Sequence, residues 1–249
     1  MKYEQRFYRN KFNSQRFRGF QVSHRETDLW IGVDPDSFEN EMEEVVRRKI
    51  VELRQKLDVY IESEPQFAKS LIPYNSVNAA PAEAKEMAQA AARAGIGPMG
   101  SVAGLFSREA GRAILENFSV KELVIENGGD IFALLKKELV LSVFAGSSPL
   151  SEKIGIVIPA GIGEVGICTS AGTVGPSFSF GKADAVAVIC RDVLLADALA
   201  TALGNEVKSP EDVEKVIGRA EEFPEILSLL IICKDKVGIT GGFEIKLLK

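Results

Sequence analysis

The chain of 249 residues is 46% apolar and 26% charged, a composition that suits a globular protein with a sizeable core and predicts one domain over residues 1–249. Thirty basic against thirty-five acidic residues give a net charge of −5, which is too balanced to indicate nucleic acid or an anionic membrane as partner. No segment approaches the roughly 20 apolar residues of a membrane-spanning helix, and the start MKYEQRFYRN lacks the apolar run of a signal peptide. The sequence therefore predicts a cytoplasmic protein.

The N-terminal segment differs from the rest of the chain in charge. Residues 1–25 hold seven basic residues against Glu4, a local charge of +6, and aromatic residues lie among them. This basic arm and the following VSHRETDLWIGVD alternate apolar and polar residues, which predicts paired antiparallel strands. A solvated edge strand is the favoured interpretation of the arm. The only histidine, His24, lies on this predicted strand, where a half-buried role is favoured over catalysis.

Three helices are predicted next. Apolar residues return at helical spacing from Ser37 to Glu62, after a DPDS start signal. A second helix is predicted over residues 80–95, with Asn78 or a neighbour as cap and Gly95 as its stop. The third follows over residues 95–118. Its first half is rich in small residues, and Gly100 and Gly104 share one face, where either another backbone or a flat ligand can approach closely.

In the second half of the chain, a series of buried strands precedes short helices, without a regular strand–helix alternation. A helix is expected from Asp192 to Gly204, and another begins with Pro210 at its first helical position. The last segment reads as strands joined at a lysine–aspartate turn. The apolar runs that predict the buried strands are residues 122–127, 139–146, 153–159 and 185–190. The order predicts an α+β fold of mixed, mainly antiparallel sheets packed against helices.

Two short segments carry residues that suit ligand binding. Gly128 and Gly129 directly follow a predicted strand and precede Asp130. Adjacent glycines let the backbone approach phosphate or ribose and present N–H groups to it. A simple hairpin turn explains the same pair and is favoured from the tripeptide alone. In LADALATALGN, Asp197 and Thr201 share a helical face and could hold Mg²⁺ through oxygen. On spacing alone, local hydrogen bonding and solvation are the favoured explanation of this pair.

The segment CTSAGT combines a thiol with hydroxyl groups and small residues. It offers Cys168, Thr169, Ser170 and Thr173, which suit a loop that hydrogen-bonds a ligand. A catalytic thiol needs a nearby base or positive field, and none is visible in the sequence. An odd number of cysteines without CxxC spacing indicates neither disulfides nor zinc. Cys190 and Cys233 each end an apolar strand run and are predicted to be structural.

LVIENGGDIFA, VGICTSAGT and AVICRDVLLADALATALG resemble, in that order, the signature segments of the ApbE superfamily, the FAD:protein FMN transferases. The match extends from roughly Pro98 to Asn205. CTSAGTVG, SFGKADAV and ADALATALGN are most similar to a small uncharacterised cytoplasmic branch of ApbE-like proteins. The resemblance implies an ApbE-like, T-fold-like architecture and a pocket for FAD or a related nucleotide.

By match to the family, Asp197 and Thr201 take the place of the Mg²⁺ ligands. The resemblance implies that the ligand contacts come from Gly128, Gly129, Asp130, Cys168, Thr169, Ser170, Ala171 and Gly172. Lys182 and the basic arm are further candidates for the phosphates. The partner implied is a flavin or nucleotide, with a protein acceptor and a homo-oligomer as additional expectations.

One departure from the family bears on catalysis. FMN transferases carry a histidine and a DPxTG-like stretch after the TSG segment, whereas this chain has Pro176 near that position. The catalytic residues are therefore unassigned. The leading hypothesis is an ApbE-like protein that binds a flavin or nucleotide, and Mg²⁺-dependent FAD cleavage or FMN transfer is the activity that this family would imply for it. A sulfur-carrier or thiol-redox protein that uses Cys168, which would need an exposed thiol with a lowered pKa, and a non-catalytic interaction scaffold are the alternatives.

Overall fold

The computed structural model describes residues 15–75, 79–172 and 180–248. Its main feature is an eight-stranded antiparallel sheet in the order β1-β2-β3-β4-β7-β8-β9-β10. The strands are β1 (Arg18–His24), β2 (Thr27–Val33), β3 (Leu123–Asn127), β4 (Asp130–Leu135), β7 (Gly163–Ser170), β8 (Ala185–Cys190), β9 (Ile226–Cys233) and β10 (Lys236–Gly241). A small antiparallel sheet in the order β11-β6-β5 consists of β5 (Leu139–Ser142), β6 (Ile154–Ile158) and β11 (Ile245–Leu247).

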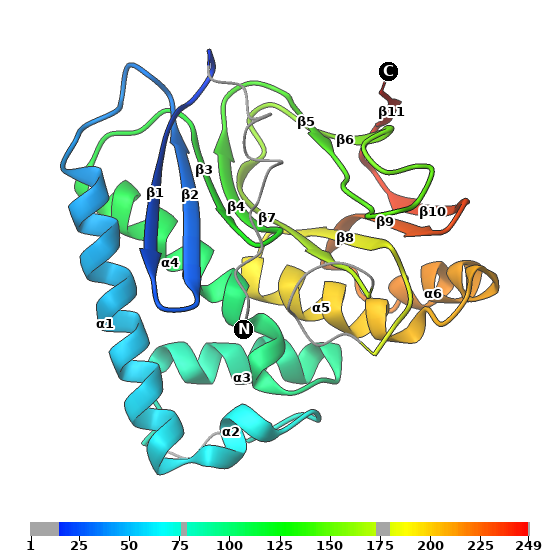
Figure 1. Ribbon diagram of the computed structural model, residues 1–249, viewed down its shortest axis with the longest axis horizontal. Coiled ribbons are helices and arrows are strands. Elements are labelled where there is room, and N and C mark those ends of the chain that lie inside the picture. Colours follow the sequence, from blue (N-terminus) through cyan, green and yellow to red (C-terminus); the bar gives the residue numbers. More distant parts are fainter. Residues whose placement is uncertain (1–14, 76–78, 173–179, 249) are drawn as a thin grey trace.

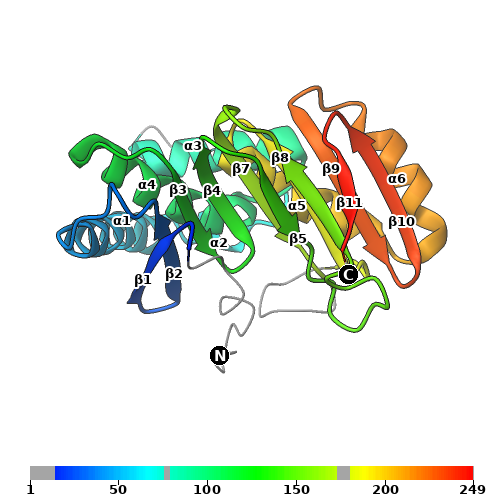
Figure 2. The ribbon, with the colours of Figure 1, turned by 90° about the horizontal axis from the view of Figure 1, so that it is seen from above.

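Helices cover one face of the large sheet and the small sheet packs on the other (Figures 1 and 2). One apolar core lies between the large sheet and the helices, and a second lies between the two sheets. The helices are α1 (Met42–Ser63), α2 (Pro65–Lys69), α3 (Ala82–Ala94), α4 (Val102–Asn117), α5 (Val193–Glu206) and α6 (Val213–Ala220), with 3-10 turns at Pro98–Ser101 and Pro210–Asp212. The predicted α+β class with mainly antiparallel sheets is confirmed.

The helical spacing of apolar residues correctly predicts the first helix, but α1 begins at Met42 rather than at Ser37. Met42, Val46 and Ile50 face the core, as apolar positions three or four residues apart do on one helical face. The DPDS segment does not cap the helix. The carboxylate of Asp34 instead accepts the backbone N–H groups of Lys121 and Glu122, so the segment secures the entry into β3.

The end of α3 follows the prediction. Gly95 has a φ of 78° and ends the helix in the left-handed conformation that glycine adopts without steric cost. Pro81 stands at the N-cap position, while Asn78, the predicted cap, lies outside the described residues. The short helix α2, which begins with Pro65, was not predicted, because five residues give too short a window for a helical period.

Helix α5 starts as predicted and ends later. The side chain of Asp192 caps the helix by accepting the N–H groups of Leu194 and Leu195, the usual role of an aspartate at this position. Gly204 does not stop the helix, which continues to Glu206. A Cβ on Gly181 would lie 1.9 Å from the carbonyl oxygen of Gly204. Gly204 therefore lies at a close backbone contact within the last turn.

Two strands beside the predicted ligand segments were not expected as strands. DIFALL forms β4, and GEVGICTS forms β7, whose last three residues are Cys168 to Ser170. The interpretation of CTSAGT as a loop is therefore wrong for its first half. The two strands pair with each other, with Asp130 opposite Cys168. Glycines within β7 weaken the local strand signal, and pairing on both sides supplies the stability that the sequence pattern does not show.

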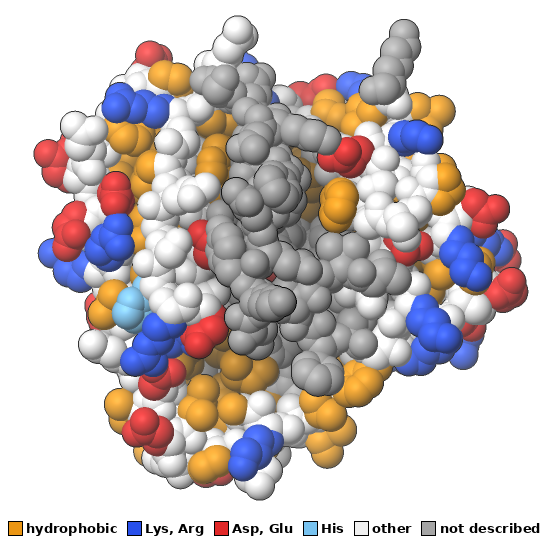
Figure 3. Space-filling model, in the orientation of Figure 1, with side chains coloured by type: hydrophobic (Ala, Val, Ile, Leu, Met, Phe, Trp, Pro, Cys, Tyr) orange, Lys and Arg blue, Asp and Glu red, His pale blue; other side chains and the backbone are white. Residues whose placement is uncertain are grey.

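The N-terminal basic segment forms a paired strand, as far as the structure describes it. Strand β1 pairs with β2 at the edge of the large sheet. Arg16 makes a bidentate hydrogen-bonded pair with Glu122, and Arg25 pairs with Asp58. These guanidinium groups are engaged within the protein. On the face shown in Figure 3, acidic and basic side chains are intermixed over the described surface.

Candidate functional site

The glycine pair and the hydroxyl segment lie against each other, as predicted. Gly128 and Gly129 form the β3–β4 turn with φ values of 69° and 104°, so the hairpin interpretation is also correct. The N–H of Thr169 donates to the carbonyl of Gly129 at 3.1 Å. A Cβ on Gly129 would lie 3.3 Å from the carbonyl oxygen of Thr169. The β3–β4 turn and the end of β7 therefore form one continuous surface.

Buried polar side chains that the sequence analysis did not single out stabilise the β3–β4 turn through hydrogen bonds. Glu126 accepts the N–H of Gly129 at 2.9 Å and is only 1% exposed. The side-chain amide of Asn127 donates to the carbonyl of Ala103 at 3.1 Å, which links the turn to the first turn of α4. Glu126 and Asn127 directly precede the glycine pair, and this adjacency is the sequence feature that could have indicated their role in fixing the turn.

Asp197 reaches the same place from α5. Its Oδ2 accepts the N–H of Gly104 at 2.8 Å, so a carboxylate from one helix caps the N-terminus of another. This arrangement satisfies an N–H group that α4 itself leaves unpaired, and it places negative charge at the positive end of the α4 dipole. The predicted metal ligand is thus a bridge between α4 and α5.

Burial dominates the electrostatics of Asp197. The residue is 8% exposed, and desolvation raises its pKa from 3.8 to about 7, partly offset by hydrogen bonds from the backbone of Gly104 and Ala103. Burial disfavours the charged form of a carboxylic acid, whereas N–H donors favour it. A nearby cation would stabilise the ionised form of this buried carboxylate, because the positive charge replaces part of the solvation lost on burial.

Thr201 lies one turn further along α5, on the side that faces the Gly97–Ser101 segment. A Cβ on Gly100 would lie 3.8 Å from the methyl group of Thr201, and a Cβ on Gly104 would lie 3.0 Å from the Cβ of Asp197. The two glycines that share a face in the sequence therefore pack against the two residues predicted to bind Mg²⁺. At Gly104, whose added Cβ would lie 2.8 Å from the carbonyl oxygen of Val193, the structure bears out close packing against a backbone, whereas an added Cβ on Gly100 would meet the side chain of Ile96.

The donor set is compatible with Mg²⁺. A carboxylate offers about four lone-pair positions, so the bond from Gly104 leaves room on Asp197 for a cation. Thr201 supplies a hydroxyl on the same helix. Mg²⁺ binds through few protein oxygens and retains water. Among the described residues, no cluster of three or more His, Cys, Asp or Glu side chains could hold a metal.

The end of β7 packs against the last turn of α5, and the segment after β7 packs against the residues that lead into β8. A Cβ on Gly204 would lie 3.3 Å from Oγ of Ser170, and a Cβ on Gly172 would lie 2.3 Å from the carbonyl oxygen of Gly181. The N–H of Gly172 donates to the carbonyl of Ala183 at 2.8 Å. These glycines are needed for close packing. Thr173 and Pro176 lie outside the described residues.

Cys168 is buried rather than exposed. It is 0% exposed, and its thiol lies 3.6 Å from the carbonyl of Val193. Burial raises its pKa well above the usual value, and the carboxylates of Asp130 and Asp197 raise it further. An inaccessible thiol with a raised pKa is the opposite of what persulfide or redox chemistry needs, so the structure contradicts the requirement of the thiol hypothesis.

The two other cysteines occupy the positions expected of structural residues. Cys190 and Cys233 are buried free thiols at the ends of β8 and β9. Burial raises the pKa of Cys190 to about 12 and also raises that of Cys233. Lys182, a candidate for the phosphates, is exposed, and its backbone N–H donates to the carbonyl of Val207 at 2.7 Å. His24 is half-buried at the end of β1, as expected.

Comparison with known sequences gives a consistent family. The model of the family described as AbpE bacteria matches residues 9–223. A UPF0280 protein of Methanosarcina barkeri is 42% identical over 189 residues, which cover 76% of this chain and 74% of that protein. A UPF0280 protein of Methanocaldococcus jannaschii is 34% identical over 222 residues, which cover 87% and 88% of the two chains.

Solved structures with the same fold include two ApbE proteins. The apo form of the flavinyl transferase ApbE of Pseudomonas stutzeri superposes with a TM-score of 0.58 at 14% identity, covering 90% of this chain and 93% of that one. The ApbE protein of Thermotoga maritima gives a TM-score of 0.53 at 16% identity, covering 92% and 96%. At this identity the likeness establishes the shared fold. In the part of the chain that the structure describes, no helix has the length and apolar character to cross a bilayer.

Proposed function

This chain belongs to the family described as AbpE bacteria, and on that premise we propose that it binds a flavin nucleotide, FAD or a close relative, with Mg²⁺ at Asp197 and Thr201. The observation that carries the proposal is the convergence of three separate segments. The Gly128–Gly129 turn, the end of β7 at Thr169 and the face of α5 with Asp197 meet at the first turn of α4. The solved relative from Pseudomonas stutzeri is described as a flavinyl transferase, which supports this ligand class.

Backbone, hydroxyl and carboxylate groups would each contribute to binding a pyrophosphate. The β3–β4 turn brings backbone rather than side chain to the ligand, because positive φ values at both glycines exclude larger residues. Thr169 and Ser170 are half-buried and carry hydroxyl groups next to this turn. Mg²⁺, when bound, would neutralise charge on the pyrophosphate. Asp197, already desolvated and fixed by Gly104, is held in place before any ligand arrives.

The proposed reaction is cleavage of FAD or transfer of its FMN part to a protein acceptor. Either reaction attacks a phosphorus atom and needs an activated nucleophile. His24 lies on β1 at the sheet edge, far along the sheet from β7, so the chain's histidine does not serve that role. We propose flavin-nucleotide binding as the shared property of both reactions, and a location in the cytoplasm, which the three free thiols support.

The test is a titration of the purified protein with FAD at fixed Mg²⁺ and after removal of Mg²⁺ with a chelator. We expect Asp197→Asn to weaken Mg²⁺-dependent FAD binding more than tenfold, which corresponds to about 1.4 kcal/mol or more. Thr201→Val should act in the same direction and less strongly. Asp235→Asn, in the exposed β9–β10 turn, is the matched control and should bind like wild type.

Two outcomes would contradict this proposal in different ways. FAD binding that is unaffected by Mg²⁺ and by Asp197→Asn would exclude the metal site and leave the nucleotide pocket. Absence of measurable FAD binding in a protein with native circular dichroism would leave an interaction scaffold as the better interpretation. Equal loss of binding in Asp235→Asn would show that the assay reports general stability.

A further inference from the structure

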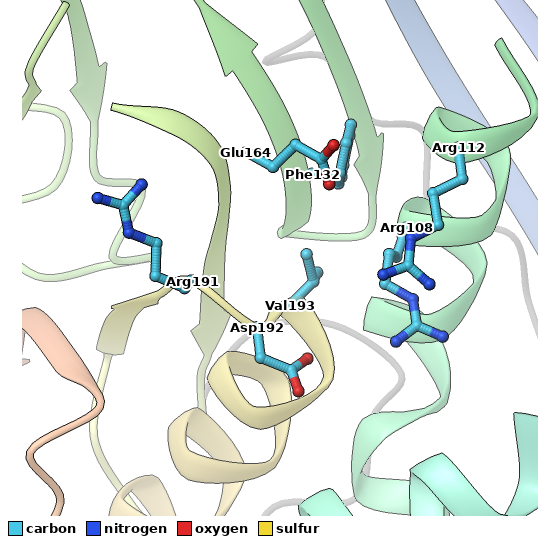
Figure 4. A pocket seen from close by; sticks show the side chains of 7 residues that line it. All are labelled: Arg108, Arg112, Phe132, Glu164, Arg191, Asp192 and Val193. Carbon is cyan, nitrogen blue, oxygen red and sulfur yellow. The ribbon is translucent and has the colours of Figure 1, made fainter. Parts of the chain in front are cut away.

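A cleft lies between α4 and the start of α5, and its lining includes none of the residues proposed for the flavin nucleotide. Its volume is about 260 Å³. It is lined by Arg108, Arg112, Phe132, Glu164, Arg191, Asp192 and Val193 (Figure 4). The helices are in contact where Gly104 meets Val193 and Asp197. Arg108 follows one turn later on α4, so the cleft lies on the other side of this contact from Thr201.

Two arginines from one helix form a wall of the cleft. Arg108 and Arg112 are four residues apart and therefore share a face of α4. Figure 4 shows both side chains extending from α4 toward the first turn of α5, with the carboxylate of Asp192 facing them across the cleft. Arg191 is directed away from α4, and its guanidinium donates to the carbonyl of Ile162.

The ion-pair network that includes these two arginines contains more cations than carboxylates. Glu109 is in ion-pair contact with Arg108 at 3.0 Å, with Lys49 at 3.2 Å and with Arg112 at 3.6 Å. Arg108 also pairs with Glu86. Three cations therefore share two carboxylates within this network. Arg112 has the longest of these contacts and a side chain that is 45% exposed, so its guanidinium retains donors that face solvent.

The carboxylate across the cleft is already engaged. Asp192 accepts the N–H groups of Leu194 and Leu195 at the start of α5, which offsets part of its charge. Glu164 is the other acidic residue of the lining and is exposed. Guanidinium groups recognise phosphate and carboxylate through paired N–H donors. Arg108 is 8% exposed and fixed by its partners, so it offers a pre-positioned donor next to the freer Arg112.

We propose that this cleft binds a small oxyanion, a phosphate or a carboxylate group, between Arg112 and Arg108 on α4. Arg112 supplies the main contact and Arg108 the fixed second one. The lining carboxylates limit the strength of binding, because they repel an anion at short range. The site is independent of the flavin-nucleotide proposal and uses none of its residues.

Binding is tested by titrating the whole protein with inorganic phosphate, and separately with acetate, at constant ionic strength. The readout is the shift of the arginine side-chain N–H signals in two-dimensional NMR, which identifies the residues involved. We expect saturable shifts at Arg112 and at least fivefold weaker binding in Arg112→Gln. Arg47→Gln is the matched control, because Arg47 is 43% exposed and pairs with a glutamate on its own helix. Its affinity should equal that of wild type.

A substitution with the opposite expected sign separates anion binding from a structural role of Arg112. Asp192→Asn removes the facing negative charge and keeps a good helix cap, so we expect at least threefold tighter binding. Saturation by phosphate alone or by acetate alone supports the site and identifies its chemistry. Shifts that do not saturate, or binding that Arg112→Gln leaves unchanged or that Asp192→Asn does not strengthen, would overturn the proposal.

Discussion

Replacing Asp197 with asparagine removes a buried carboxylate whose pKa burial has raised from 3.8 to about 7. The native protein holds this proton more tightly than the unfolded chain does, so the carboxyl group favours the folded state at low pH. As the pH rises above 4, the unfolded chain loses the proton first, and stability falls until the native carboxyl group has also ionised near pH 7. The expected loss is about 1.4 kcal/mol per pH unit within that window.

Between pH 5 and pH 8 the loss amounts to about 3 kcal/mol, because the slope fades as the pH passes the native pKa. The asparagine side chain does not titrate, and its oxygen can still accept the N–H of Gly104, which lies 2.8 Å from Oδ2 of Asp197. We therefore expect the variant to gain about 3 kcal/mol in unfolding free energy relative to wild type over this range. Other groups titrate in both proteins and cancel in the difference.

The assay is urea unfolding of both proteins at four pH values from 5 to 8, followed by circular dichroism, in buffer with a chelator so that no divalent cation binds. A difference in unfolding free energy that stays constant within about 1 kcal/mol across the range would refute the reasoning, because Asp197 would then titrate alike in both states. Repeating the series with Mg²⁺ should reduce the pH dependence of wild type alone, since a bound cation lowers the native pKa.

Two further predictions concern packing. Gly104→Ala places a Cβ 2.8 Å from the carbonyl oxygen of Val193, so this variant should be less stable than wild type by about 1 to 3 kcal/mol. An added Cβ on Gly218 of α6 has nothing within 4 Å. Gly218→Ala should therefore stabilise the protein by about 0.5 to 1 kcal/mol, because alanine favours the helix more than glycine does. Urea unfolding measures both, and equal effects would show that the α4–α5 contact is not tight. Cys168, Cys190 and Cys233 are free and buried, so all three should react with iodoacetamide only after unfolding; rapid alkylation of the native protein, located by mass spectrometry, would contradict their burial.

Several local features follow from the sequence because they depend on residues close together in the chain. The apolar period of α1, the αL stop at Gly95 and the cap at Asp192 are decided within one or two helical turns. Ser209 and Asp212 form a capping box before α6 in the same way. The order of the predicted helices and strands indicated the α+β class, and the resemblance of the glycine and ADALAT segments to a known family named the residues of the candidate site.

The tertiary structure decided what those residues do. Pairing of β4 with β7 brings Gly129 to Thr169 and buries Cys168 under α5, and neither outcome is encoded in the local pattern around the cysteine. Asp197 caps α4 across 93 residues of sequence, and the arginines of α4 face Asp192 only because two helices cross at Gly104. Contacts between distant segments depend on register and packing, and burial then sets the pKa values of Asp197 and Cys168. Short-range periodicity carries no information on either.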